Sequence, residues 1–382
     1  MKPVIYLAFV DDWEVRGNGS GDPRVLQFEP MRKLVKIFND HGVKGSFNVE
    51  VMQQLAYRRL QEDFPELKEI ADEWDEVTRE SYRQGHDIQL HLHPQWRDAI
   101  YEGRGQWHLD GDWSILNYPG SEMKAMLARG REYLEKLLRP INPQYSCVSF
   151  RAGSWCAAPS ESLMPALSEL GFVFDMSIVA GIRYDTPQVQ LDYTRCQETF
   201  APYYPEMRDA RRVARAAQPM VCIPTNSFSG ARFALLRRDL SKARLALARK
   251  LARSRNGHGG QSARFTRGHS GDEWTNRGES GAAGMVKRIF RRYMKGQLHI
   301  ADLSRLNYAM MRRMMANIRE QAADSGLARV PVILENHTKD IFDFSHIERF
   351  VASVAHSPDI RTVTLTEVAR GLRNGEFKIR TA

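Results

Sequence analysis

The sequence predicts an α/β protein with a mostly parallel sheet, either open or closed into a barrel. Two observations lead to this fold class. Short apolar segments typical of strands alternate along the chain with segments in which apolar residues recur at helical spacing, a pattern that favours parallel strands joined by helices. Acidic residues or histidines follow several of these strands directly, and the carboxyl ends of parallel strands are where such folds gather catalytic residues.

The first half of the chain alternates regularly between strand and helix. The apolar run 4–10 predicts a strand and leads straight into Asp11 and Asp12. Gly42 can end the helix that follows, and Pro94 ends a segment in which apolar and polar residues alternate strictly, as in a half-buried strand. The elements expected in this half are a helix at 31–38, strands at 43–49 and 86–93, helices at 67–77 and 121–138, and a strand at 147–150.

The second half continues the alternation with one interruption. A helix is expected at 160–170 and a short strand at 172–174, which Asp175 follows. After the interruption we expect a helix at 303–318, a strand at 330–334 that precedes His337, a helix at 345–356, a strand at 362–365 and a final helix. Residues 1–207 and 298–382 are therefore expected to form one domain.

The interruption at residues 208–297 differs from the rest of the chain in its charge. It holds 21 Lys and Arg against 5 Asp and Glu, a balance of +16, so the other residues carry −7 and the net charge of +9 is a local property. We expect a basic insertion of amphipathic helices around a flexible loop rich in Gly, Ser and Arg. Its cationic surface, above all residues 232–296, could contact an anionic membrane. The simpler interpretation is that the charged faces of its helices lie in solvent and bind no partner.

The composition is that of an ordinary soluble enzyme, with 42% hydrophobic and 26% charged residues. The four cysteines show no CxxC spacing, so neither a zinc knuckle nor a redox pair is indicated. The first apolar run is too short for a signal peptide or a membrane span. We therefore expect a cytoplasmic location, which includes the inner face of the membrane. No nucleic-acid-binding module accompanies the basic charge, which argues against nucleic acid as a partner.

His91 and His93 are candidate metal ligands. Residues two apart on a strand point to the same side, so both imidazoles could bind one cation, with a carboxylate from a neighbouring strand as the third ligand. Two histidines and one carboxylate leave positions open for water and substrate, as in catalytic zinc sites. The same set suits Fe(II) in oxygenases, and a pair of hydrogen-bonded interior histidines is the alternative without a metal.

The adjacent carboxylates of Asp11 and Asp12 could have different roles in one site. One could bind the cation while the other takes a proton from water. A strand-end turn or a helix cap is the structural alternative.

Five motifs, in this order, resemble those of the polysaccharide deacetylases with the nodulation-type deacetylase homology domain, carbohydrate esterase family 4. Residues 9–12 (FVDD) look like the family's TFDD motif, and residues 85–91 (GHDIQLH) look like its GHEIGNH motif. Residues 150–155 (FRAGSW), 171–177 (GFVFDMS) and 334–337 (LENH) are similar to its arginine, GFxYDSS and last histidine motifs. The resemblance covers nearly the whole chain outside the insertion and implies a distorted parallel (β/α)7-type barrel.

The resemblance also implies a metal site with Asp12 and His91 as ligands. The family's second histidine would stand four residues after His91, where this chain has Gln95. We assign that role to His93, because the strand alternation already puts it beside His91. Zinc is the metal that this ligand set suits first.

For the catalytic groups, the resemblance makes Asp11 the general base and His337 the general acid. It makes Arg151 the residue that orients Asp11, and it suggests Asp175 as the residue that positions His337. The arginine motif lacks the family's usual Pro-Tyr ending, and no DxxDW element is evident.

The residues and the resemblance together predict a metal-dependent hydrolase that removes an N-acyl group, with acetyl the first choice, from an amino sugar in polysaccharide or lipopolysaccharide assembly. A glycan, a sugar nucleotide or a lipid-linked saccharide would be the substrate. The alternatives are a deformylase or small-amide hydrolase of the same fold, an Fe(II) oxygenase, and a non-catalytic protein that binds a glycan or a membrane.

Overall fold

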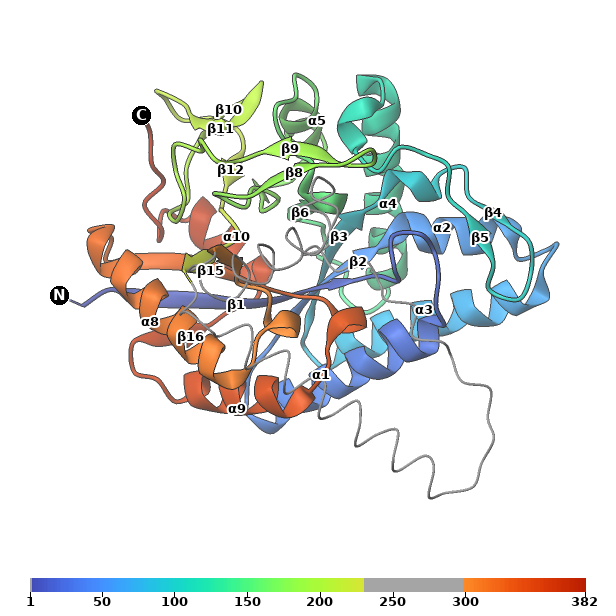
Figure 1. The fold of residues 1–382 in the computed structure, drawn as a ribbon, viewed down its shortest axis with the longest axis horizontal. Coiled ribbons are helices and arrows are strands. Elements are labelled where there is room, and N and C mark those ends of the chain that lie inside the picture. Colours follow the sequence, from blue (N-terminus) through green and yellow to red (C-terminus); the bar gives the residue numbers. More distant parts are fainter. Residues whose placement is uncertain (1, 230–297) are drawn as a thin grey trace, which may run out of the picture.

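The computed structural model describes residues 2–229 and 298–382, and its centre is one curled parallel sheet (Figure 1). Seven strands follow the order β12-β7-β6-β3-β2-β1-β15, and β16 pairs with the first half of β1. An isolated parallel bridge between Thr225, just after β12, and Ile333 of β15 links the two ends of this order. The described residues therefore form the distorted (β/α)7-type barrel that the resemblance implies, and they confirm the parallel sheet that the sequence pattern predicts.

The strands of the barrel are short except for β1 and β15, which pair over eight residues from Val4↔Arg329 to Asp11↔Asn336. Within the described residues, four antiparallel strand pairs lie outside the main sheet. The barrel strands are β1 (Val4–Trp13), β2 (Ser46–Glu50), β3 (Asp87–Leu92), β6 (Ser149–Ala152), β7 (Phe174–Asp175), β12 (Val221–Cys222), β15 (Arg329–Asn336) and β16 (Ile360–Thr362). Three of the pairs are hairpins, which join β4 (Ile100–Tyr101) to β5 (Trp107–His108), β8 (Arg183–Asp185) to β9 (Gln190–Asp192), and β10 (Pro205–Glu206) to β11 (Asp209–Val213), and the fourth pairs β13 (Ser227–Ser229) with β14 (Leu298–Ile300) from distant parts of the chain.

Helices cover the outside of the sheet and close one end of it (Figure 1). They are α1 (Glu29–Asp40), α2 (Val51–Leu60), α3 (Pro65–Arg83), α4 (Gly120–Leu138), α5 (Leu163–Glu169), α8 (Tyr308–Asp324), α9 (Phe344–Ala355) and α10 (Leu365–Arg373). Short helical turns include η1 (Arg24–Phe28), η2 (Pro94–Trp96), η3 (Ile115–Asn117), η4 (Gly153–Trp155), η6 (Leu303–Arg305) and η7 (Thr338–Asp340). Among the described helices, none combines the length and the apolar character needed to cross a bilayer.

Alternation along β1 divides the core in two. Phe9 points outward, where its ring lies 5.4 Å from that of Phe38 in α1 and 6.1 Å from that of Phe350 in α9. Ala8 and Val10 point inward and pack in a second cluster with Ile333 of β15 and the apolar side of α10. Successive strand residues face opposite sides of a sheet, so even-numbered residues of β1 face the barrel interior and odd-numbered residues face the helices.

Helix α10 closes the end of the barrel at which the strands begin. A capping box between Thr364 and Glu367 starts it. Asp87, the first residue of β3, accepts hydrogen bonds from the backbone N–H and the hydroxyl of Thr366. The candidate functional groups lie at the opposite end, where the strands finish.

Several elements differ from those expected, among them the strands of the hairpins β4–β5, β8–β9 and β10–β11, which were not expected. β1 continues through Asp11 and Asp12 to Trp13 instead of ending at Val10. Helix α2 was not expected, and Glu50 starts it by accepting hydrogen bonds from two backbone N–H groups of its first turn. The helix expected at 303–318 is divided into η6 and α8, because Asn307 caps a new helix start at α8.

The main sheet also extends into the range expected for the insertion. Val221 and Cys222 of β12 are buried and pair with β7, and β13 follows within the described residues. The boundary expected at residue 208 therefore moves, since the barrel and its hairpins continue to residue 229. The amphipathic helices and the flexible loop are expected within residues 230–297, which lie outside the described part of the chain.

Candidate active site

Two carboxylates from the end of the first strand enter the barrel interior together. Asp12 is in β1 and Glu14 follows it by two residues, so both lie on the inward side and both are buried. Asp12 Oδ1 accepts a hydrogen bond of 2.9 Å from the side-chain amide of Asn48 in β2. Its other oxygen lies 3.8 Å from Nε of Arg151 in β6.

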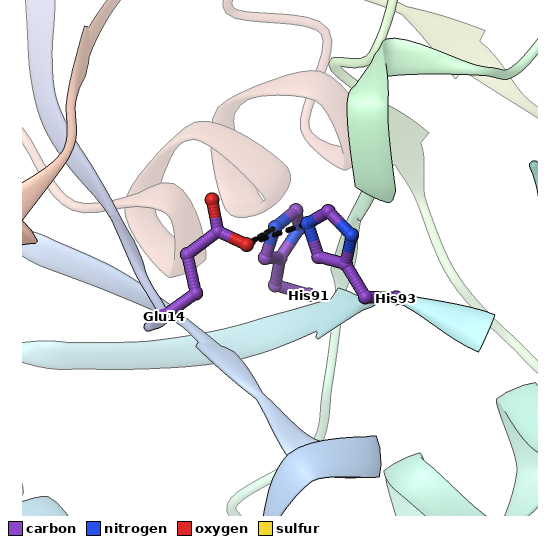
Figure 2. A group of neighbouring side chains, drawn as sticks. All are labelled: Glu14, His91 and His93. Carbon is purple, nitrogen blue, oxygen red and sulfur yellow. Dashed lines mark ion pairs between the residues drawn. The ribbon is translucent and has the colours of Figure 1, made fainter. Parts of the chain in front are cut away.

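His91 and His93 share the carboxylate of Glu14. Glu14 Oε2 lies 2.5 Å from His93 Nε2 and 3.5 Å from His91 Nε2. Figure 2 shows the three side chains pointing toward one another from β1 and β3. His91 Nδ1 lies 3.0 Å from the backbone carbonyl oxygen of Arg151 and donates its proton there, so Nε2 is the ring nitrogen that faces Glu14.

A second group forms around Asp12, Glu335 and His337. Their ligand atoms all lie within 4.8 Å of one another. Arg151 lies between the two carboxylates, with its Nη1 3.5 Å from Glu335 Oε1. Trp155 donates a 2.9 Å hydrogen bond from its indole to the same oxygen of Glu335. The Arg151 side chain is fully buried, and its positive charge fills the space between these carboxylates.

His337 is held by Asp302 from the segment that enters η6. Nδ1 of His337 lies 3.1 Å from Asp302 Oδ2, and Oδ1 of Asp302 accepts hydrogen bonds from the backbone and hydroxyl of Ser304. This leaves Nε2 of His337 facing the interior, 3.9 Å from the nearer oxygens of both Asp12 and Glu14. Burial opposes the imidazolium, but Asp302 outweighs it and raises the pKa of His337 to about 9.

The charges of the cluster are set by burial and by close partners. Burial opposes ionisation of Glu14, but the charges of His93 and Lys339 hold its pKa well below the usual range. Burial also opposes the charged form of His91, and the neighbouring Asp12 and Glu14 raise its pKa to about 9. Burial raises the pKa of Glu335 to about 7. Groups with such displaced pKa values gathered in one place are typical of active sites.

The residues that the sequence singled out are only partly brought together. His91, His93, Asp12, Arg151 and His337 meet at the end of the barrel. The third member of the histidine group is Glu14, whereas Asp12 groups with Glu335 and His337.

Asp11 lies elsewhere than expected. It is on the helix-facing side of β1 and accepts a hydrogen bond from the side-chain amide of Asn336, its register partner in β15. Burial raises its pKa to about 8. Alternation along the strand is the physical reason, because Asp11 and Asp12 cannot both face the interior. Arg151 accordingly lies against Asp12 and Glu335, and it does not orient Asp11.

Asp175 is not the partner of His337. Its two oxygens accept hydrogen bonds from the backbone and hydroxyl of Ser177, two residues further along. The position beside His337 is taken by Asp302.

Four residues of the site were not expected from the sequence: Glu14, Asp302, Glu335 and Lys339. Alternation could have found two of them, since Glu14 follows Asp12 by two residues and Glu335 precedes His337 by two. No local pattern marks Asp302 or Lys339.

The group of Glu14, His91 and His93 fits a divalent cation. Two imidazole nitrogens and a carboxylate oxygen are ligands that zinc prefers, and three protein ligands leave room for water and substrate. The buried Nε2 of His91 has no hydrogen-bond partner among the described residues, as expected for an atom that binds a metal. The second group is a poorer fit, because Arg151 already forms ion pairs with both Asp12 and Glu335.

The fold is shared with solved structures of low sequence identity. A proposed glycoside hydrolase/deacetylase from Parabacteroides distasonis matches with a TM-score of 0.50 and 12% identity, covering 98% of this chain and 71% of that one. A proposed polysaccharide deacetylase from Mycobacterium smegmatis has a TM-score of 0.49 and 15% identity, covering 100% and 94%. Another from Pseudomonas aeruginosa PAO1 has a TM-score of 0.45 and 12% identity, covering 98% and 93%. The sequence matches no protein-family model and no curated protein.

Proposed function

We propose that the protein is a metal-dependent hydrolase that removes an N-acyl group, first an acetyl group, from an amino sugar. The observation that carries this proposal is the shared carboxylate of Glu14 between His91 and His93, with Asp12 and His337 facing the same interior. The deacetylase named among the solved structures of this fold agrees with it.

Glu14, His91 and His93 would hold the cation, with zinc as the first choice. A divalent cation in this position would make a water molecule more acidic and would stabilise negative charge on an acyl oxygen. Each histidine presents Nε2 to Glu14 Oε2, so the three ligand atoms already converge before a cation is bound.

Asp12 would accept the proton of the attacking water. It faces the interior, and it lies 3.9 Å from Nε2 of His337 across the site. Asn48 and Arg151 hold its two oxygens from different sides, which fixes the direction of the carboxylate. We assign this role to Asp12 in place of Asp11, which faces the helices.

His337 would donate a proton to the departing amine. Asp302 keeps its imidazole protonated and turned so that Nε2 points inward. An amine is a poor leaving group unless it is protonated, so a cationic imidazole in this position serves amide cleavage. Glu335, held by Trp155 and Arg151, lies 3.6 Å from the same Nε2 and fixes its position further.

The proposed substrate is a glycan, a sugar nucleotide or a lipid-linked saccharide that carries an N-acylated amino sugar. We also propose a cytoplasmic location, with contact to an anionic membrane through residues 232–296, which lie outside the described residues. Vesicle sedimentation with and without this segment tests that contact, and equal binding by the two proteins would contradict it.

The activity is tested by measuring acid release from N-acetylated and N-formylated oligosaccharides by the zinc-loaded protein. We expect acetate release that requires Glu14, with Glu14→Gln inactive. Formate release alone would indicate a deformylase. Zinc binding without release of either acid would contradict the proposed reaction.

A further inference from the structure

Lys339 lies directly beside the proposed metal ligands. It is in η7, two residues after His337, and its ammonium group donates a hydrogen bond to Glu14 Oε1. Only 15% of its side chain is exposed. A lysine ammonium group carries a positive charge and only donates hydrogen bonds, so the Glu14 carboxylate is a matched partner for it.

The two oxygens of Glu14 therefore have separate partners. Oε2 faces both imidazoles, at 2.5 Å from His93 and 3.5 Å from His91. Oε1 accepts the hydrogen bond from Lys339 and lies 3.9 Å from Nε2 of His337. A cation between the histidines thus meets one oxygen, while the other is already neutralised.

We propose that Lys339 is a positioning residue that makes Glu14 a one-oxygen ligand, and that it thereby selects a cation that prefers nitrogen ligands. This inference rests on the proposed metal site. A carboxylate that binds through both oxygens favours cations that prefer oxygen, such as Mn²⁺, Mg²⁺ and Ca²⁺. With one oxygen and two imidazoles, the site favours Zn²⁺ or Co²⁺.

The charge of Lys339 affects the affinity for cations, not the selectivity among them. An ammonium group next to a ligand repels every divalent cation to a similar extent, so the preference comes from the occupied Oε1 of Glu14. Arg305, which forms ion pairs with Asp302 and Asp340, adds positive charge behind η7. Selectivity is then set by a residue that itself does not touch the metal.

The test compares the dissociation constants for Zn²⁺ and Mn²⁺ in the whole protein, measured by competition with a chelating dye. Lys339→Met keeps the length of the side chain but removes the charge and the hydrogen bond. We expect the preference for Zn²⁺ over Mn²⁺ to fall about tenfold or more in this variant. Lys339→Arg, which keeps the charge, should stay within about threefold of the wild type.

A spectroscopic measurement tests the same inference without the need to determine a dissociation constant. The visible absorption of bound Co²⁺ weakens when its coordination number rises, so Co²⁺-loaded Lys339→Met should absorb less strongly than the wild type if the second oxygen becomes a ligand. Lys68→Met on the exposed side of α3, where Lys68 pairs with Asp72, is the matched control and should change neither measurement. Lys339→Gln provides a second neutral variant should Lys339→Met fold poorly.

The outcomes separate this inference from the proposed function. Equal Zn²⁺ binding by the wild type and Glu14→Gln would overturn the metal site and the role of Lys339 together. If Glu14→Gln loses Zn²⁺ while Lys339→Met and Lys339→Gln keep the wild-type preference and Co²⁺ spectrum, the metal site stands and the inference about Lys339 is wrong.

Discussion

Asp11 and Asp12 are adjacent in the sequence but face opposite sides of β1. The carboxylate of Asp11 is hydrogen-bonded to Asn336 on the helix side, whereas that of Asp12 lies among Asn48, Arg151 and His337 in the barrel interior. The two residues therefore have different roles, and exchanging each for asparagine distinguishes them.

Asp12→Asn is expected to abolish turnover, because an amide cannot accept the proton of the attacking water. Removing a general base costs about 100-fold or more in kcat. Asp11→Asn should keep kcat within about threefold, since burial raises the pKa of Asp11 to about 8 and its neutral form dominates near neutral pH. Steady-state kinetics on the same N-acetylated oligosaccharide compares the two variants, and the reverse order of their losses would restore Asp11 as the base.

Asp302→Asn should reduce amide hydrolysis about tenfold or more, because the imidazolium of His337 loses the carboxylate that stabilises it. An aryl acetate ester needs no proton for its leaving group, so its hydrolysis should fall much less. This dependence on the leaving group would not arise from a purely structural defect.

Asp175→Asn is the matched control for that experiment. Asp175 bonds to Ser177 and not to His337, so the ratio of amide to ester hydrolysis should remain that of the wild type. A leaving-group effect in Asp175→Asn, with none in Asp302→Asn, would reverse the assignment.

Gly153→Ala should weaken zinc binding. A Cβ atom at residue 153 would lie 2.7 Å from both His93 Nδ1 and the backbone oxygen of Leu92, so the imidazole must move. Displacing a support of a metal ligand typically costs about 10-fold or more in affinity. Calorimetric titration with zinc measures the change.

Gly130→Ala is a control of similar crowding on the opposite, helix-facing side of β3. Its Cβ would lie 2.9 Å from a methyl group of Leu90, so it should lower stability without altering the zinc affinity. Equal zinc affinities in Gly153→Ala and the wild type would show that His93 is not a ligand.

His86 makes stability depend on pH. Burial lowers its pKa from 6.5 to about 4, and its Nδ1 accepts a hydrogen bond from the backbone N–H of Gly45. Below pH 6.5, His86 binds a proton in the unfolded chain but not in the folded chain. The free energy of unfolding therefore has its full value, as far as His86 is concerned, above pH 6.5 and decreases as the pH falls toward 4.

His86→Asn should keep the hydrogen bond from Gly45 and remove the titration. Between pH 7 and pH 5, the wild type is expected to lose about 2 kcal/mol more of its free energy of unfolding than the variant does. Urea unfolding at the two pH values measures this difference, and parallel losses in both proteins would contradict the assignment to His86.

The periodic parts of the site could be predicted from the sequence. His91 lies in β3 and His93 directly follows its last residue, and the alternating pattern of this segment already put both on one side. Glu14 was missed because β1 was expected to end at Val10, although the alternation continues past Asp12. The position of a strand end depends on pairing with β2, which extends to Trp13↔Val49 and is not visible in the sequence of β1 itself.

Contacts between distant segments could not be predicted in this way. Asp302 reaches His337 because the segment after β14 pairs with β15 through the bridge Asp302↔Glu335. This pairing depends on the tertiary fold, and nothing in the spacing of the sequence marks it. The resemblance suggested Asp175 for the same role, but the local turn to Ser177 already satisfies that carboxylate.

The most direct test of the central claim is the zinc content per chain after dialysis against a weak chelator, measured for the wild type, Glu14→Gln and Asp12→Asn. A site built from Glu14, His91 and His93 predicts close to one zinc in the wild type and in Asp12→Asn, and close to none in Glu14→Gln. Full zinc in Glu14→Gln together with loss from Asp12→Asn would contradict the site and would return the ligand role to Asp12.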